Sequence, residues 1–131
     1  MARRHPLSFQ ELRVANLERC NTVFHPVLGI DEWGSSDWAV ALAGEVGEAC
    51  DVVKKMRRKQ GAVGRTTDLV HGRAKDWDSE DMKNALAQEL ADVIIYADLL
   101  AARNGIDLGA AVIHKFNLVS GKVDSDVLLD E

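Results

Sequence analysis

Apolar positions recur three and four residues apart along most of the chain, which is the spacing of amphipathic helices. The pattern predicts helices over residues 8–24, from 36 or 37 to about 59, over 79–103 and from 107 to about 120. Segment 26–36 is rich in turn residues, 61–77 is predicted to be a loop insertion, and 123–131 is predicted to be a tail. No segment alternates convincingly with the two-residue period of a strand. We therefore predict an all-α fold of four helices, in one domain over 1–131 with its core at 36–122.

Helix boundaries are marked by residues that cap backbone groups. Ser8 followed by Glu11 has the spacing of a capping box, in which each side chain accepts a hydrogen bond from the other residue's backbone. The pair Asn104-Gly105 is a typical stop signal at the end of the 79–103 helix. Both prolines, Pro6 and Pro26, precede residue 27, so the rest of the chain is free to be helical.

Two of the predicted helices share a short repeat whose acidic residues face the core. Residues 41–48 read ALAGEVGE and residues 85–92 read ALAQELAD. On a helical wheel, Glu45 and Glu89 fall inside the apolar arcs of their helices, whereas Glu48 and Asp92 lie at the edges. Burying an unpaired carboxylate costs several kcal/mol. The repeat therefore predicts a compensating cation.

The spacing of these acids favours a metal site. Residues three apart lie on neighbouring turns of one helix face, so two such helices side by side would bring four carboxylates together. An all-oxygen site suits the hard cation Mg²⁺, with Mn²⁺ as an alternative, and Mg²⁺ usually shares its shell with substrate phosphates. A ferritin-like di-iron site would instead need Glu-x-x-His elements. Either pair taken alone is more often a solvated face or an ion-pair partner.

Basic and aromatic residues near the acid pairs are candidate substrate contacts. Eight basic residues and one acidic residue lie between positions 54 and 75. Of these, Lys54 and Lys55 would attract a polyphosphate, or would simply favour the carboxyl end of a helix. Trp38 could stack on a base or belong to the core. Tyr96 follows the second acid pair by one turn, and its hydroxyl needs a partner if it is buried.

Composition limits the class of protein. The 131 residues are 47% hydrophobic and carry a net charge of −5, which argues against a nucleic-acid binder. No apolar run approaches the ~18 residues of a membrane span. The residues after Met1 do not resemble a secretory signal, and Cys20 and Cys50 form no CxxC motif. We expect a cytoplasmic protein with no membrane partner.

Two longer segments, WAVALAGEVGEACDVVKK (38–55) and QELADVIIY (88–96), resemble the MazG-like all-α nucleoside triphosphate pyrophosphohydrolases. These proteins carry an E-x-x-E … E-x-x-D metal motif. The stretches LLAARNGIDL (99–108) and HKFNLVS (114–120) also look like the family, so the resemblance covers about residues 36–122. It is closest to the dCTP pyrophosphatase and phage-type branches. The resemblance implies a four-helix MazG-like bundle that uses Mg²⁺ to convert a nucleoside triphosphate, ribo- or deoxy-, to the monophosphate and pyrophosphate.

Carried over residue by residue, the resemblance also implies roles for individual side chains. The metal ligands would be Glu45, Glu48, Glu89 and Asp92. Tyr96 would contribute to the nucleotide pocket, and the K-x-N element Lys115 and Asn117 would contact phosphate and sugar. We assign Glu48 as the general base that orients the attacking water. The 40 residues between the two acid pairs are more than is typical of the family. The alternative function is a non-catalytic helical module that binds nucleotides or a partner through the same groove.

Assembly is predicted from the helix at 79–103, which is apolar around most of its circumference between Val93 and Ala102. A four-helix bundle would leave Ile95, Leu99 and Ala102 facing outward, and exposed apolar surface of this kind usually marks an interface. Identical chains most often close such an interface by twofold symmetry. Together with the resemblance, this predicts a homodimer or a homotetramer, with the tetramer slightly favoured.

Overall fold

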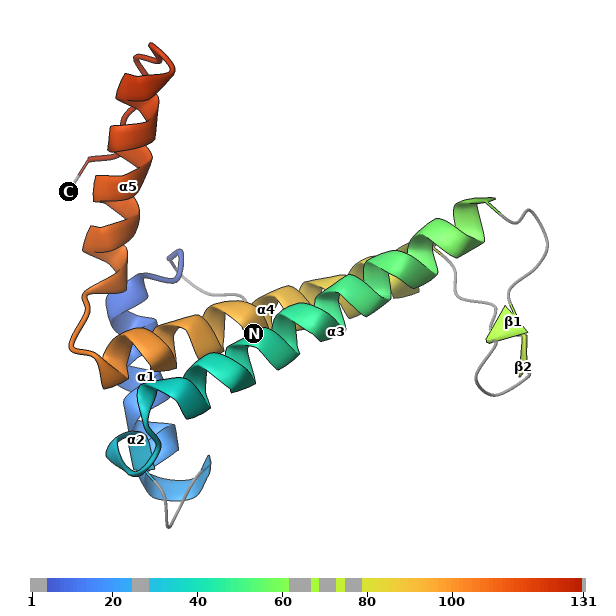
Figure 1. Cartoon of the computed structure of the whole chain (residues 1–131), viewed down its shortest axis with the longest axis horizontal. Helices are drawn as coiled ribbons and strands as arrows, with labels where there is room; N and C mark the ends of the chain where they lie inside the picture. The colour runs from blue at the N-terminus through green and yellow to red at the C-terminus, as the bar shows by residue number, and fades with distance from the viewer. Residues whose placement is uncertain (1–4, 25–28, 62–66, 69–72, 75–78, 131) are drawn as a thin grey trace. The chain divides into compact units, whose positions relative to one another are not determined.

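The computed structural model describes residues 5–24, 29–61, 67–68, 73–74 and 79–130, and most of them are helical (Figure 1). The α-helices are α1 (Phe9–Arg19), α2 (Gly29–Glu32), α3 (Ser35–Gly61), α4 (Ser79–Arg103) and α5 (Leu108–Lys122). A π-helical turn, η1 (Cys20–Phe24), extends α1. A short antiparallel ladder pairs β1 (Thr67–Asp68) with β2 (Arg73–Ala74).

The all-α class predicted from the periodicity is confirmed apart from the two-residue ladder. The four predicted helices correspond to α1 with η1, α3, α4 and α5. Helix α2 was not predicted, because four residues in a turn-rich segment are too few to show a helical period. The ladder lies within the predicted 61–77 loop, and residues 62–66, 69–72 and 75–78 of that insertion fall outside the described part of the chain.

The predicted helix ends are confirmed by their hydrogen bonds. The Glu11 backbone N–H donates to Ser8 Oγ at 3.1 Å, and the Ser8 N–H donates to Glu11 Oε2 at 2.9 Å, which completes the capping box. Helix α4 ends at Arg103, and two residues later Gly105 has a φ of +65°, the left-handed conformation that glycine adopts without strain. Asp107 then caps α5, accepting from the Ala110 N–H at 2.9 Å.

The chain divides into two compact units. Unit 1 consists of residues 1–39 and 97–131, and unit 2 consists of residues 40–96. Among the described residues, the buried side chains of unit 1 are Asn16, Cys20, Trp38, Asp98, Leu99, Ala101 and Ser120. Those of unit 2 are Ala49, Val52 and Met82. Unit 2 therefore buries few side chains of its own.

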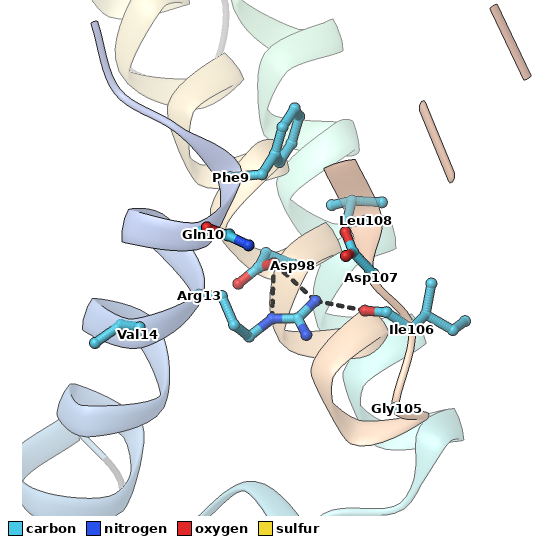
Figure 2. Close-up of a pocket in the computed structure, with 9 residues that line it drawn as sticks. All are labelled: Phe9, Gln10, Arg13, Val14, Asp98, Gly105, Ile106, Asp107 and Leu108. Carbon is cyan, nitrogen blue, oxygen red and sulfur yellow. Dashed lines mark hydrogen bonds and ion pairs between the residues drawn. The ribbon is translucent and has the colours of Figure 1, made fainter. Parts of the chain in front are cut away.

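A buried carboxylate joins three segments of unit 1. Asp98 of α4 is only 1% exposed, and Arg13 of α1 donates to its Oδ1 through Nε at 3.0 Å, with Nη2 also 3.0 Å from that oxygen. Asn16 Nδ2 donates to Asp98 Oδ2 at 3.1 Å. The same guanidinium donates to the Ile106 carbonyl at 2.8 Å, beside a hollow of about 490 Å³ (Figure 2). Both carboxylate oxygens are satisfied, so α1 is held against the end of α4 and the turn into α5.

A second contact set in unit 1 fixes the segment that leads into α3. Trp38 is fully buried, and its indole N–H donates to the Ile30 carbonyl at 3.2 Å. The Trp33 ring lies 4.7 Å from the Trp38 ring, centroid to centroid. Arg103 Nε donates to the Trp33 carbonyl at 2.8 Å, which ties this segment to the last turn of α4.

The tail after α5 folds back on that helix. The Leu129 N–H donates to Asn117 Oδ1 at 2.8 Å, and Asn117 Nδ2 donates to the Leu129 carbonyl at 2.9 Å. The Ser125 N–H donates to the Ser120 carbonyl at 2.9 Å. Both ends of the Asn117 amide are therefore used inside the chain.

The expectation that Leu99 faces outward is wrong. Leu99 is 1% exposed, and Ile95 and Ala102 are half-buried. The helical wheel could not show that α1 packs against this end of α4, next to the buried Asp98. The exposed apolar side chains of α4 lie earlier, at Leu90 and Ile94, which are 50% and 48% exposed. No helix in the described part of the chain is long and apolar enough to cross a membrane.

Replacing Arg13 should test how far unit 1 depends on its buried ion pair. Arg13→Leu leaves the Asp98 carboxylate buried without its cation, so we expect a loss of ~3–5 kcal/mol in the free energy of unfolding, measured by urea denaturation. The exposed Lys83→Ala on α4 is the control, with a change within ~0.5 kcal/mol. A loss below ~1 kcal/mol for Arg13→Leu would mean that Asp98 is compensated by other groups.

Candidate metal centre

Helices α3 and α4 lie alongside one another in unit 2 and bring three acidic side chains together. Glu45 comes from α3, and Glu89 and Asp92 come from neighbouring turns of α4. One carboxylate oxygen of each residue lies within 4.8 Å of the other two. All three side chains are half-buried. The predicted convergence of the two acid pairs is thus found for three of the four acids.

The electrostatics of this cluster are uncompensated. Glu89 Oε2 is shut off from solvent and has no hydrogen-bond partner among the described residues, which is rare for a buried polar atom. Partial burial, followed by the charges of Glu48, Asp92 and Glu89, raises the pKa of Glu45. Partial burial also raises the pKa of Glu89, together with a hydrogen bond to Glu48 and the charges of Glu48 and Asp92. Each carboxylate is harder to ionise because of its neighbours.

Glu48, the fourth acid of the motif, has a different position. It is exposed, and it shares side-chain hydrogen bonds with Glu45 and with Glu89. It does not belong to the group of three oxygens that lie within 4.8 Å of one another. Glu48 therefore lies next to the cluster but is not one of its three converging carboxylates.

The donor set of the cluster fits a hard divalent cation. Glu45, Glu89 and Asp92 offer three carboxylate oxygens with no nitrogen or sulfur donor, which is the chemistry that Mg²⁺ and Mn²⁺ prefer. A cation held there would give Glu89 Oε2 the partner it lacks and would offset the repulsion within the cluster. Three protein ligands leave coordination positions for water or phosphate oxygens.

The two lysines predicted as substrate contacts share one carboxylate. Lys55 Nζ lies 3.0 Å from Asp51 Oδ2, and Lys54 Nζ lies 3.7 Å from Asp51 Oδ1. The hydrogen bond and charge of Lys55 hold the pKa of Asp51 below its usual range. Both ammonium groups are about half exposed, and Lys55 faces the same hollow as Glu48 and Glu89.

That hollow, which we call the glycine hollow, has a volume of about 450 Å³. It is lined by Gly44, Gly47, Glu48, Asp51, Val52, Lys55, Ala85 and Glu89. A Cβ atom added at Gly44 or Gly47 would meet no described atom within 4 Å. The sequence analysis missed this feature, although two glycines inside a long helix, each costing ~1 kcal/mol relative to alanine, were a readable signal.

The α3–α4 pair also has an apolar groove, of about 360 Å³. Its lining is almost entirely aliphatic: Val46, Ala49, Cys50, Val53, Leu86, Leu90 and Val93. Val46, Val53 and Leu90 are 43%, 49% and 50% exposed. The groove was not predicted either, because a wheel of one helix does not show how two helices meet.

The remaining predicted contacts are distributed over both units. Tyr96 is half-buried at the end of unit 2. Trp38, Lys115 and Asn117 belong to unit 1. There Trp38 is part of the core, Asn117 holds the tail, and Lys115 is exposed on α5.

Comparison of the sequence with protein-family models and with curated proteins finds no match.

Removing one acid should stabilise the metal-free protein at neutral pH. The pKa of Glu45 and of Glu89 is raised on folding, so the folded state binds these protons more tightly than the unfolded chain. Stability therefore falls as the pH rises from the unfolded value, ~4.3, to the folded pKa. Glu45→Gln and Glu89→Gln should each raise the melting temperature at pH 7 by a few degrees.

The pH dependence of the melting temperature distinguishes relief of charge repulsion from a stabilisation that has another cause. Below about pH 4 the carboxyls are protonated in both states, so the advantage of the glutamine variants should vanish there. Glu18→Gln, an exposed change on α1, is the control and should not shift the melting temperature at either pH. An advantage that persists unchanged at pH 4 would contradict the assignment of repulsion as its cause.

Proposed function

We propose that this chain hydrolyses a nucleoside triphosphate, ribo- or deoxy-, to the monophosphate and pyrophosphate with the help of Mg²⁺. The observation that supports the proposal is the meeting of Glu45, Glu89 and Asp92, with Glu89 Oε2 buried and without a hydrogen-bond partner among the described residues. The type of reaction is inferred from the E-x-x-E … E-x-x-D pattern, which resembles the metal motif of the MazG-like pyrophosphohydrolases. Glu45, Glu89 and Asp92 would hold the cation.

The charge balance of the site explains the need for a cation. Carboxylates repel a polyphosphate, so the acid cluster alone has no affinity for the substrate. A bound Mg²⁺ supplies Lewis-acid polarisation of phosphoryl oxygens. Lys55, which faces the glycine hollow, offers a second positive charge to phosphate oxygens. Its pairing with the exposed Asp51 is weak enough to be exchanged for a phosphate.

Glu48 is the residue best placed to act on water. It is exposed, lies beside the cluster and is outside the group of three oxygens, so it remains available as a general base. In the proposed reaction, Glu48 accepts a proton from water while the water oxygen bonds to the α-phosphorus. The bond between the α-phosphorus and the oxygen bridging to the β-phosphorus breaks, and pyrophosphate leaves with that oxygen.

Turnover on a panel of nucleotides tests the proposal. With Mg²⁺, the wild-type chain should release pyrophosphate, and Glu45→Gln or Glu89→Gln should lower kcat/KM by at least ~100-fold while the circular dichroism spectrum stays helical. We also expect Mn²⁺ to raise the melting temperature of the wild type and not that of these two variants. Glu80→Gln, exposed in the first turn of α4, is the control and should keep full activity.

The products decide between the alternatives. Release of orthophosphate and a nucleoside diphosphate would place cleavage at another bond and would contradict the proposal. Nucleotide binding without any product would favour the non-catalytic module. Near-wild-type turnover of Glu45→Gln and Glu89→Gln would show that the acid cluster is not the metal centre.

We also propose that the chain forms a closed homo-oligomer through the apolar groove of unit 2, as a dimer or a dimer of dimers. Two paired helices make one layer, and a layer needs a second one to bury its apolar face. The described residues of unit 2 bury only Ala49, Val52 and Met82, while Leu90 and Ile94 stay half exposed. A twofold axis would set the groove against the same groove of a second copy, giving four helices in two layers.

Light scattering at micromolar concentration should therefore give a mass of at least twice 14.4 kDa. Leu90→Glu should reduce it to the monomer mass, because a charge in the groove would be buried unpaired. Val127→Glu, at an exposed apolar position in the tail, is the control and should leave the mass unchanged. A monomer mass for the wild type would contradict the proposal.

The two cysteines give an independent readout of the same interface. Cys50 lines the groove, so its modification by a maleimide should slow as the protein concentration rises. Cys20 is buried in unit 1, and burial raises the pKa of its thiol, so it should stay unreactive at every concentration.

A further inference from the structure

We propose that the glycine hollow receives the nucleoside of the substrate while the phosphates bind at the acid cluster, an inference that rests on the proposed function. The hollow and the cluster share Glu89, and Glu48 lines the hollow beside it. A single nucleotide would therefore span both. The hollow has a volume of about 450 Å³ and is open to solvent, so a nucleoside could reach it directly.

The shape of the hollow depends on two glycines of α3, Gly44 and Gly47, which have no side chain to fill it. Gly44 and Gly47 lie three residues apart on α3, so both contribute to one face of the helix. Glycine weakens a helix interior, and here no described atom of the chain uses the room that the glycines leave. Ala85 contributes the smallest side chain that α4 could offer on the facing side. Helix backbone without Cβ atoms forms a flat wall that a ring can approach closely.

The charges of the hollow favour the uncharged part of the nucleotide. Its lining holds three carboxylates, Glu48, Asp51 and Glu89, against the one ammonium of Lys55. Lys55 can pair with one phosphate oxygen, but a whole triphosphate placed in the hollow would face a net negative wall. Sugar hydroxyls and base amino groups instead donate hydrogen bonds, and ionised carboxylates only accept them. The nucleoside therefore complements the hollow, and the phosphates complement a cation at the cluster.

Alanine substitution fills the hollow without touching the acids. In Gly44→Ala and Gly47→Ala, the new methyl groups meet no described atom, so the melting temperature should rise. The same methyl groups should raise KM for the best nucleotide of the panel about tenfold while kcat changes less than about twofold. Inorganic pyrophosphate with Mg²⁺ has no nucleoside, so its inhibition constant should not change.

Gly121→Ala is the matched control. Gly121 is an exposed glycine of α5 whose added Cβ would also meet no described atom within 4 Å. This variant should gain thermal stability in the same way and keep the wild-type KM. A KM effect confined to Gly44→Ala and Gly47→Ala would separate the hollow from a general effect of a stiffer helix.

Four results would overturn the inference. They are an unchanged KM in both hollow variants, an equal weakening of nucleotide and pyrophosphate, a fall in melting temperature, and dissociation of the oligomer, which would place a second chain in the hollow. If the wild type releases no pyrophosphate, the proposed function fails separately. The hollow is then tested by calorimetry with the α,β-methylene analogues of the panel nucleotides, whose binding the two variants should weaken about tenfold.

Discussion

A carboxylate removed from water must be compensated, and of the two units of this chain only unit 1 meets that requirement with its own side chains. In unit 1, Asp98 receives a guanidinium and an amide from α1, so the charge that would destabilise the core instead joins its parts. In unit 2, Glu89 keeps one oxygen that is buried and unpartnered among the described residues, with other acids nearby. The first arrangement is complete within the chain. The second lacks such a partner among the described residues, and this is the observation behind the proposal that a cation binds in unit 2.

Much of the fold could be predicted because the capping and stop signals are local. Ser8 with Glu11 and the glycine at position 105 each act on backbone groups a few residues away, so the sequence alone is sufficient. The burial of Leu99 could not be predicted in this way, since it depends on α1 crossing the end of α4. Helix α2 and the β1–β2 ladder were missed because segments of two to four residues carry no measurable period.

The candidate site also has features that the sequence of one helix predicts and features that depend on how two helices pack. All four acids were predicted to converge, and Glu45, Glu89 and Asp92 do so. The wheel puts Glu48 and Asp92 alike at the edges of their apolar arcs, so it could not predict that Asp92 is half-buried in the cluster while Glu48 is exposed. The glycine hollow and the apolar groove arise from the shape between α3 and α4, and no single-helix pattern encodes that shape. One helix pair thus offers both a polar recess and an apolar one, which suit a small molecule and a protein surface respectively.

The separation in sequence between Arg13 and Asp98 has a consequence for synthesis of the protein. The two residues are 85 positions apart, so α1 leaves the ribosome long before its partner on α4 exists. At ~5–20 residues per second the delay is roughly 4 to 17 s, during which α1 has no surface to pack against. The Arg13–Asp98 pair of unit 1 therefore cannot form before most of the chain has been made, whereas unit 2 is contiguous and has no such delay. A nascent chain stalled before residue 98 would lack the carboxylate that pairs with Arg13, so this contact of unit 1 is made late in synthesis.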